Sequence, residues 1–339
     1  MKRLAFSLSL ALAALAAARQ HDGTLGLIQT PNNGLPALVL PGGTFEATLR
    51  EEARLALVGD AHTIPLNTTW RDVPGPAVVA TCTVPARAPQ GAYAIEAQAE
   101  DGADHTARAV YVLESFPETY TVAHVSDTHI GKDQRHPRVS DAINRDLAAA
   151  VNNTDAAFTL ITGDLTETGA LDEYRRFLEI LDLYAMPTFV CAGNHDRLED
   201  HYERFFGPLA YTFWFGKDGY LAFDTKDFLV ADELGRQDAD IEVYRRALKP
   251  ARWTVGFTHR FEPSMGMRSQ ITLFVDNPLD FLLVGHRHRA NTEEETRVPW
   301  GSTPISIVPA AIDGRMRLIQ VDPVAIQPND VIQAAKVTK

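Results

Sequence analysis

Five short apolar segments, each followed at once by polar residues that can bind metals or protons, constrain the fold of this chain more than any other feature. Apolar runs of this length are typical of strands that are buried on both faces of a sheet. Parallel strands end at one edge of a sheet, so we expect the polar residues to meet there. The five segments are residues 121–126 before Asp127-Thr128-His129, 158–162 before Gly163-Asp164, 189–192 before Gly193-Asn194-His195-Asp196, 253–257 before Thr258-His259, and 281–284 before Gly285-His286-Arg287-His288.

Two amphipathic patterns separate the first three of these segments. Residues 139–151 and 171–184 carry apolar side chains at the spacing of a helix with one buried face. The order strand, helix, strand, helix, strand predicts an α/β domain with a mainly parallel sheet.

The sequence after the third segment predicts a second sheet. Residues 211–215 and 220–223 flank a turn at Lys217-Asp218-Gly219, which indicates a hairpin. Residues 305–308 and 316–321 are expected to form another pair of strands. We therefore expect the second sheet to be more antiparallel than the first.

The N-terminal part of the chain has a different pattern. Alternating segments at residues 44–49, 54–58, 78–84, 93–98 and 107–112 are separated by turns rich in proline and glycine. This pattern predicts a small all-β, immunoglobulin-like β-sandwich over residues 20–113. The expected order of the rest is a linker at 114–118, a catalytic domain at 119–325 and a C-terminal tail at 326–339.

The first 18 residues resemble a secretory signal peptide. Lys2 and Arg3 precede an Ala/Leu-rich run, and Ala16 and Ala18 offer a small-residue cleavage site. The alternative is a membrane anchor, but the run is shorter than the roughly 20 residues that a spanning helix needs. We therefore expect an exported protein, periplasmic or secreted, without a stable membrane anchor.

Charge and cysteine content exclude several classes of protein. The net charge of -12 disfavours long nucleic acid and anionic membrane surfaces as partners. Cys82 and Cys191 are the only cysteines and fall in different predicted domains, so no disulfide framework is expected. No feature of the sequence indicates a protein partner.

The polar strand ends supply two carboxylates, one amide oxygen and four imidazoles. These are too many ligands for one ion and suit two ions if one carboxylate bridges them. Each motif alone is a weak signal, whereas five in series, each after an apolar strand, are a strong one. The candidate metal ligands are Asp127, His129, Asp164, Asn194, His259, His286 and His288.

This series of motifs resembles that of the calcineurin-like metallophosphoesterases, over about residues 119–321. The resemblance implies a four-layer αββα sandwich with two mixed sheets and two divalent transition-metal ions, with Mn, Fe or Zn expected. It implies that Asp164 bridges the two ions. By the same resemblance, the first metal would be held by Asp127, His129, Asp164 and His288, and the second by Asp164, Asn194, His259 and His286.

Two residues beside the ligands are candidates for catalytic roles. The resemblance makes His195 a neighbour of the metals and not a ligand, so it is expected to protonate the leaving group or stabilise the transition state. Asp196 is expected either to orient His195 or to cap the following helix. Two ions about 3.5 to 4 Å apart can share a hydroxide and hold phosphoryl oxygens for in-line attack.

The motifs favour one branch of the family. The Asp-x-His motif at Asp127 and the Gly-Asn-His-Asp motif are similar to those of the cyclic-nucleotide phosphodiesterase branch, which favours a small phosphodiester or nucleotide as substrate. Purple acid phosphatases have a tyrosine ligand near the position of Glu167 and lack the histidine seen here at 129, so a tyrosinate-iron centre is not expected. The alternatives are a broad phosphomonoesterase at the same site and, less favoured, a metal-free protein-binding scaffold.

Overall fold

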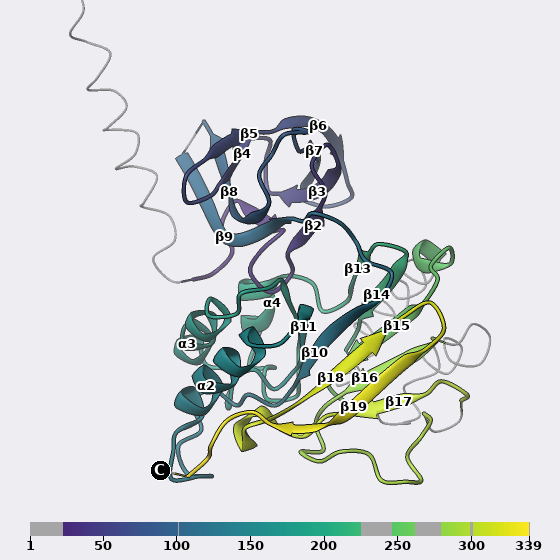
Figure 1. The fold of residues 1–339 in the computed structure, drawn as a ribbon. Coiled ribbons are helices and arrows are strands. Elements are labelled where there is room, and N and C mark those ends of the chain that lie inside the picture. The colour runs from purple at the N-terminus through teal and green to yellow at the C-terminus, as the bar shows by residue number, and fades with distance from the viewer. Residues whose placement is uncertain (1–22, 101, 225–245, 262–278, 299–300, 339) are drawn as a thin grey trace, which may run out of the picture. The chain divides into compact units, whose positions relative to one another are not determined.

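The computed structural model describes residues 23–100, 102–224, 246–261, 279–298 and 301–338 (Figure 1). The chain divides into two compact units. The first contains the chain up to Ser115 together with Arg204–Gly207, and the second contains Phe116–Glu203 and Pro208–Lys339. The predicted signal peptide lies outside the described residues. Within the described ranges no helix is long and apolar enough to cross a membrane.

The first unit is built from two sheets around one apolar core. Alternate residues of each strand point inward, and Ala47, Leu49, Leu57 and Ile95 are fully buried between the sheets. The all-β architecture predicted for this part of the chain is therefore present. In spatial order, one sheet contains β1 (Ile28–Thr30), β3 (Thr44–Leu49), β7 (Val78–Thr83) and β6 (Asn67–Asp72), and the other contains β2 (Ala37–Val39), β9 (Gly102–Val112), β8 (Gly91–Ala99), β4 (Arg54–Val58) and β5 (Thr63–Pro65).

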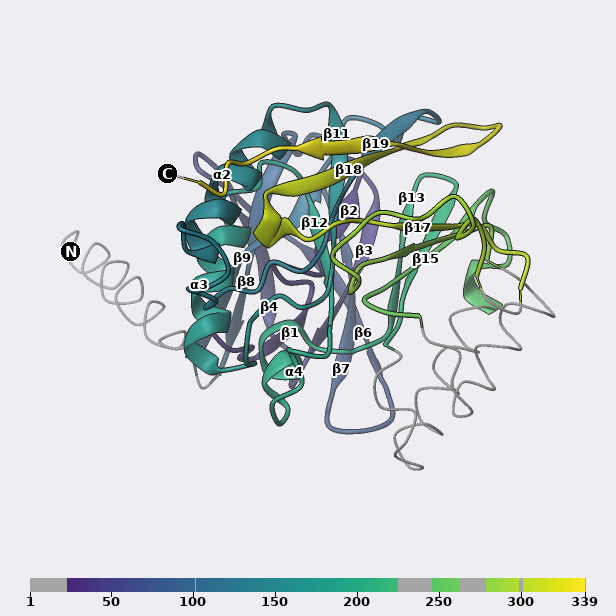
Figure 2. The ribbon, with the colours of Figure 1, turned by 90° about the horizontal axis from the view of Figure 1, so that it is seen from below.

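The second unit begins with a sheet that helices cover on one face (Figure 2). Strands β10, β11 and β12 of this sheet run parallel to one another, as predicted. Strand β18 pairs antiparallel with β10, and β19 pairs antiparallel with β18. The buried side of α2 includes Ile143 and Leu147, and that of α3 includes Tyr174 and Phe177. The spatial order is β12 (Thr188–Cys191), β11 (Ala156–Thr162), β10 (Tyr120–Val125), β18 (Arg315–Val321) and β19 (Ile326–Gln333), with α2 at Ser140–Asn152, α3 at Leu171–Leu181 and a short α4 at His201–Phe206.

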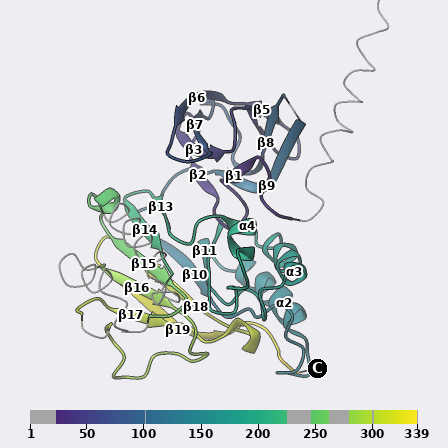
Figure 3. The same ribbon diagram turned by 180° about the vertical axis from the view of Figure 1, so that it is seen from behind.

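The other sheet of this unit is mostly parallel, so the prediction of a more antiparallel sheet is wrong. Only the predicted hairpin of β13 and β14 is antiparallel, while β14, β15, β16 and β17 run parallel (Figure 3). The expected pair near the C-terminus does not form, because its strands enter different sheets: β17 joins β16 and β18 joins β10. The order is β13 (Tyr211–Phe215), β14 (Asp218–Ala222), β15 (Thr254–Thr258), β16 (Phe281–Val284) and β17 (Ile305–Ile307).

The segment predicted as a C-terminal tail contains an edge strand instead. Ile326–Gln333 forms β19, which pairs antiparallel with β18. Most of its residues are exposed or half-buried, and Pro328 lies within it. Proline is tolerated in an edge strand because one side of that strand needs no hydrogen-bond donors. The polar, proline-containing sequence therefore concealed a strand.

Aromatic rings pack the two sheets of the second unit against each other. Phe213 of β13 stacks on Phe189 of β12, with ring centroids 3.6 Å apart, and Phe158 of β11 meets Phe213 edge-on at 5.5 Å. This packing brings the carboxyl ends of both sets of parallel strands to a common edge. Together, α2 and α3 and the two sheets make three layers. The second helical layer that the resemblance implies stays a prediction, and residues 225–245 and 262–278 lie outside the described ranges.

Candidate metal centre

The loops that follow five parallel strands carry the candidate ligands in a strained backbone conformation. Five of the seven candidates have positive φ angles, between 45° and 67°. Residues with a side chain rarely adopt this left-handed region, and such strain collects at functional sites. The five are Asp127, His129, Asp164, His286 and His288.

Two glycines let these loops approach one another. A Cβ atom at Gly193 would clash with the backbone nitrogen of Asp164, and one at Gly285 would clash with the side chain of Ser126. Neither Gly193 nor Gly285 has a positive φ angle. The glycine before Asn194 is therefore needed for close packing between loops.

The first group of candidate ligands is Asp127, His129 and His288. The Nε2 atom of His288 lies 3.0 Å from Oδ1 of Asp127 and 3.2 Å from Nε2 of His129. One donor atom from each residue lies within 4.8 Å of the other two. Asp127 and His129 are buried and His288 is partly buried. The three side chains can therefore reach a single ion.

The second group is Asp164, His259 and His286. The Nε2 atom of His259 lies 3.1 Å from Oδ2 of Asp164 and 3.1 Å from Nδ1 of His286. The Nδ1 atom of His259 donates to the carbonyl of Thr162 at 2.9 Å, which directs Nε2 into the group. These three side chains also place their donor atoms within 4.8 Å of one another.

Asp164 faces both groups. Its Oδ2 atom is 3.1 Å from His259 in the second group and 3.8 Å from Nε2 of His129 in the first. Its Oδ1 atom accepts a hydrogen bond of 2.9 Å from the backbone N–H of His195. The side chain is buried between the loops. This position is the one that a carboxylate shared between two ions must occupy.

The donor set fits two divalent transition-metal ions. Imidazole nitrogens face each other at 3.1 Å in one group and 3.2 Å in the other. The Oδ1 atom of Asn194 is buried and has no hydrogen-bond partner in the described part of the chain. Buried polar atoms without a partner are rare, and an ion is one explanation for them. Mixed nitrogen and oxygen donors suit Mn, Fe and Zn. The ligand role of Asn194 itself stays a prediction.

The electrostatics of the site keep the two carboxylates ionised and His129 neutral, while, despite burial, the Asp164 carboxylate raises the pKa of His259 to about 9. Burial raises the pKa of Asp127 and Asp164, but the hydrogen bonds and charges of the neighbouring histidines together outweigh burial, so both pKa values lie below the usual range. Burial lowers the pKa of His129 to about 4, because its neighbouring carboxylates only partly oppose the loss of solvent. Ionised carboxylates and a neutral imidazole are the protonation states that bind metals.

His195 lies beside the two groups and is open to solvent. Its side chain is 37% exposed, and its Nε2 atom lies 4.0 Å from Oδ2 of Asp164. Its ring meets that of His129 edge-on, with centroids 4.8 Å apart. Its Nδ1 atom donates to the carbonyl of Glu167 at 2.5 Å. The ring is therefore oriented with Nε2 toward the site and toward any bound substrate.

Asp196 does not orient His195, contrary to one of the two roles expected for it. Its carboxylate is fully buried and accepts hydrogen bonds from the backbone N–H groups of Gly193, Leu165 and Thr166, at 2.8 to 3.0 Å, and from the Thr166 hydroxyl at 2.8 Å. Burial raises its pKa to about 6, although these bonds oppose the rise. Asp196 therefore ties the loop after β11 to the loop after β12, and the carbonyl of Glu167 orients His195.

Replacing Asp196 with asparagine is expected to destabilise the second unit. One amide nitrogen would face two N–H donors that a carboxylate oxygen now accepts, so the free energy of unfolding should fall by about 2 to 4 kcal/mol. The measurement is chemical denaturation followed by circular dichroism. Asp172→Asn, at an exposed position of α3, is the matched control. Equal stability of the two variants would contradict the loop-tying role.

Glu167 and Arg135 lie near the ligands, but the sequence did not indicate them as site residues. The Oε2 atom of Glu167 lies 2.7 Å from Nδ1 of His129, and its Oε1 atom is 2.5 Å from Nζ of Lys132. On the other side, Nη1 of Arg135 lies 2.9 Å from Nδ1 of His288 and the same guanidinium pairs with Asp313. A carboxylate is a common partner for the ring nitrogen of a metal-binding histidine that does not bind the metal, which fits Glu167, whereas the Arg135 guanidinium can only donate to His288. The sequence feature that could have indicated Glu167 as a site residue is its position three residues after Asp164, in the same loop.

Replacing Glu167 with glutamine is expected to weaken metal binding at the first group. The neutral amide removes the negative charge that lies 2.7 Å from Nδ1 of His129, so affinity for the more weakly held ion should fall by about 10-fold to 100-fold. Competition with a chromogenic chelator measures this affinity directly. Glu179→Gln, on the exposed side of α3, serves as the control. Unchanged affinity would leave Glu167 with no role in positioning His129.

The fold and site define a class of protein: an α/β sandwich that gathers two groups of metal ligands at the carboxyl ends of its strands. A model of the family described as calcineurin-like phosphoesterase matches residues 120–290, which is half of the chain. The chain belongs to this family, whose members are metal-dependent phosphoester hydrolases, and the family implies a dinuclear site for divalent metals.

Two named relatives resemble the chain at low identity. A probable cyclic nucleotide phosphodiesterase of Vesicomyosocius okutanii subsp. Calyptogena okutanii is 24% identical over 190 residues, which are 50% of this chain and 79% of the relative. The probable glycerophosphodiester phosphodiesterase GpdQ of Arcobacter nitrofigilis is 32% identical over 112 residues, 32% of this chain and 40% of that protein. The match thus spans less than half of the second relative.

Solved structures resemble the chain only distantly. The purple acid phosphatase PPD1 from yellow lupin is 13% identical, with a TM-score of 0.49, and the match covers 87% of this chain and 72% of that chain. A dimetal phosphatase from Danio rerio is 11% identical, with a TM-score of 0.42, and the match covers 62% of this chain and 98% of that chain.

Proposed function

We propose that this protein hydrolyses small phosphodiesters or nucleotides at the paired metal-ligand groups. The observation that carries the proposal is the position of Asp164, which faces both groups while the exposed His195 lies beside them. The names of the two relatives, a cyclic nucleotide phosphodiesterase and a glycerophosphodiester phosphodiesterase, support a diester as substrate.

The ligand groups prepare the site for an anionic substrate. Asp127, His129, Asp164 and His288 would hold one ion, and Asp164, Asn194, His259 and His286 the other. When bound, two divalent ions lower the pKa of water and neutralise phosphoryl oxygens. The loops supply these donors from rigid strand ends, so little reorganisation is needed when substrate arrives.

His195 is the proposed proton donor to the leaving oxygen. With Nδ1 held by the Glu167 carbonyl, a protonated ring presents its second N–H from Nε2 toward the site. A donor in this position is needed most when the leaving group is a poor one, such as an alkoxide.

The substrate preference is tested with p-nitrophenyl phosphate and bis-p-nitrophenyl phosphate. Protein stripped with a chelator and refilled with Mn(II) is expected to bind about two ions and to prefer the diester, while the stripped protein should show little turnover. Preference for the monoester would favour the broad phosphomonoesterase instead. Absence of both bound metal and turnover would indicate a metal-free scaffold.

Export is a separate proposal, supported by the composition of residues 1–18. A chain processed at the expected site would begin near Arg19. Cell fractionation followed by N-terminal sequencing tests this. Full-length protein in the cytoplasm would contradict it.

A further inference from the structure

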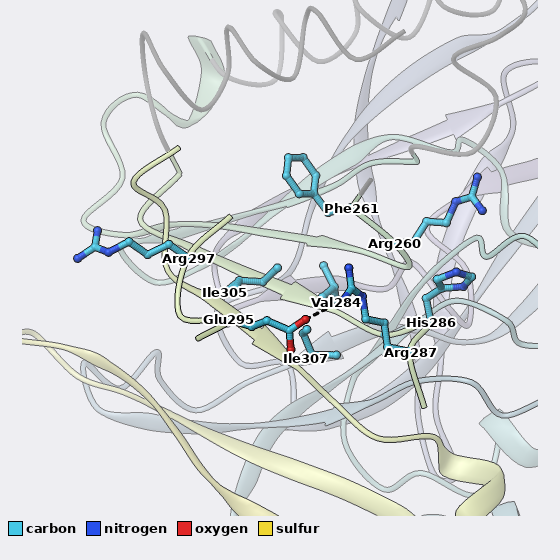
Figure 4. A pocket seen from close by; sticks show the side chains of 10 residues that line it. Arg260, Phe261, Val284, His286, Arg287, Glu295, Arg297, Ile305 and Ile307 are labelled. Atoms are coloured by element: carbon cyan, nitrogen blue, oxygen red, sulfur yellow. Dashed lines mark hydrogen bonds and ion pairs between the residues drawn. The ribbon is translucent and has the colours of Figure 1, made fainter. Parts of the chain in front are cut away.

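A small pocket lies beside His286 and is not explained by the metal ligands (Figure 4). Its floor is apolar and consists of Val284, Ile305 and Ile307. Val284 of β16 is directly paired with Ile307 of β17, and Ile305 lies two residues earlier on the same face. Val284 and Ile307 are buried, whereas Ile305 is half-buried and available for contact. The pocket therefore has an apolar floor on one face of the second sheet.

One wall of the pocket is held in place by a network of ion pairs. Glu295 accepts hydrogen bonds of 2.7 Å from Arg287, 2.6 and 2.8 Å from Arg289, and 2.9 Å from the backbone N–H of Thr292. Figure 4 shows the bond between Glu295 and Arg287 crossing beside the floor. The loop after His286 is thereby fixed without a ligand, and a preformed wall reduces the entropy cost of binding.

A guanidinium and a histidine mark the end of the pocket nearest the metal ligands. Arg260 and His286 lie at that end, and Arg297 lies at the opposite end (Figure 4). Arg260 follows the candidate ligand His259 directly in the sequence. A guanidinium at this position favours an anionic phosphate group over a neutral one. The pocket therefore begins beside the second group of candidate ligands, at His286.

The pocket and His195 lie by different groups of ligands. His195 meets His129 of the first group, whereas the pocket begins at His286 of the second. If His195 protonates the leaving oxygen, the leaving group points toward His195. The pocket then faces the ester group that stays on phosphorus.

We propose that this pocket binds the retained ester group of a phosphodiester, and that it selects an apolar or aromatic group. The inference rests on the proposed phosphodiesterase function. An apolar group against Ile305, the half-buried member of the floor, displaces water from apolar surface, which supplies the preference. A small retained group leaves that surface exposed.

The test uses two diesters with the same leaving group, phenyl p-nitrophenyl phosphate and methyl p-nitrophenyl phosphate. The metal-loaded protein is expected to have a kcat/KM about 10-fold or more higher for the phenyl diester. Ile305→Trp fills the pocket and should bring the ratio close to one, and Ile305→Ala should lower it by removing part of the floor. Ile64→Trp, at a half-buried isoleucine of β5, is the matched control and should retain the wild-type ratio.

The outcomes separate this inference from the proposed function. No turnover of either diester by the metal-loaded wild type would contradict the phosphodiesterase function and the pocket with it. Turnover of both diesters at equal kcat/KM would overturn the pocket alone. So would an unchanged ratio in both Ile305 variants, provided that metal content and melting temperature match the wild type. Using two substitutions of opposite size keeps the test decisive even if one variant fails to fold.

Discussion

Asp164→Asn is expected to lose both metal and activity. The carboxylate faces both ligand groups and accepts the backbone N–H of His195, so its replacement removes a charge from each group at once. Loss of a residue that only hydrogen-bonds to a metal ligand lowers metal affinity or activity by about 10-fold to 100-fold. Loss of a ligand that both groups share should therefore lower kcat/KM by more than about 100-fold. Metal content per chain, measured by elemental analysis, should fall from about two to one or fewer.

The control for this variant is an acidic residue away from the site. Asp172→Asn, on the exposed side of α3, changes the net charge equally and should retain two ions and full turnover. Circular dichroism shows whether each variant is folded. If folded Asp164→Asn kept both ions and its activity, the result would contradict both the shared role of Asp164 and the proposed active site.

His195→Ala is expected to lower turnover while leaving metal content intact. The ring lies beside the ligands and is held by the Glu167 carbonyl, so its loss removes a proton donor without removing a metal ligand. General acid catalysis contributes about 100-fold to 10,000-fold, and the loss should approach that range for diesters with an alkoxide leaving group. For p-nitrophenolate, which needs little protonation, the loss should be much smaller.

The dependence on leaving group is the decisive measurement for His195. A plot of log kcat/KM against leaving-group pKa should be steeper for the variant than for the wild type. His62→Ala, at an exposed histidine of the first unit, is the control and should leave the slope unchanged. Equal loss for good and poor leaving groups would indicate that His195 positions substrate and does not donate a proton.

The sequence identified the candidate ligands because their signal is local. A buried strand and the polar residue at its end are neighbours in the chain, so Asp127, Asp164 and His259 could be found without knowing which strands are adjacent. The parallel pairing of β10, β11 and β12 followed from the intervening helices, which impose a crossover.

Features that depend on contacts between distant segments could not be found in this way. Residues 305–307 and 315–321 are both clear strands, but their partners are β16 and β10, which no local pattern specifies. The role of Asp196 depends on the approach of Leu165 and Thr166 from another loop. The contact of Glu167 with His129 likewise joins two loops. Apolar periodicity reports burial and does not report the identity of the neighbour.

The left-handed backbone of five ligands links folding to metal supply. Placing a residue with a side chain in this region raises the free energy of the folded state by about 1 kcal/mol or more. The sum over five residues is comparable to the free energy of unfolding of a typical domain, which is roughly 5 to 15 kcal/mol. Binding of ions to the native state alone offsets that cost by mass action. The melting temperature should therefore report the local concentration of available metal. Glycine at His129 should relax the backbone while removing a ligand, making the metal-free protein more stable and metal binding weaker.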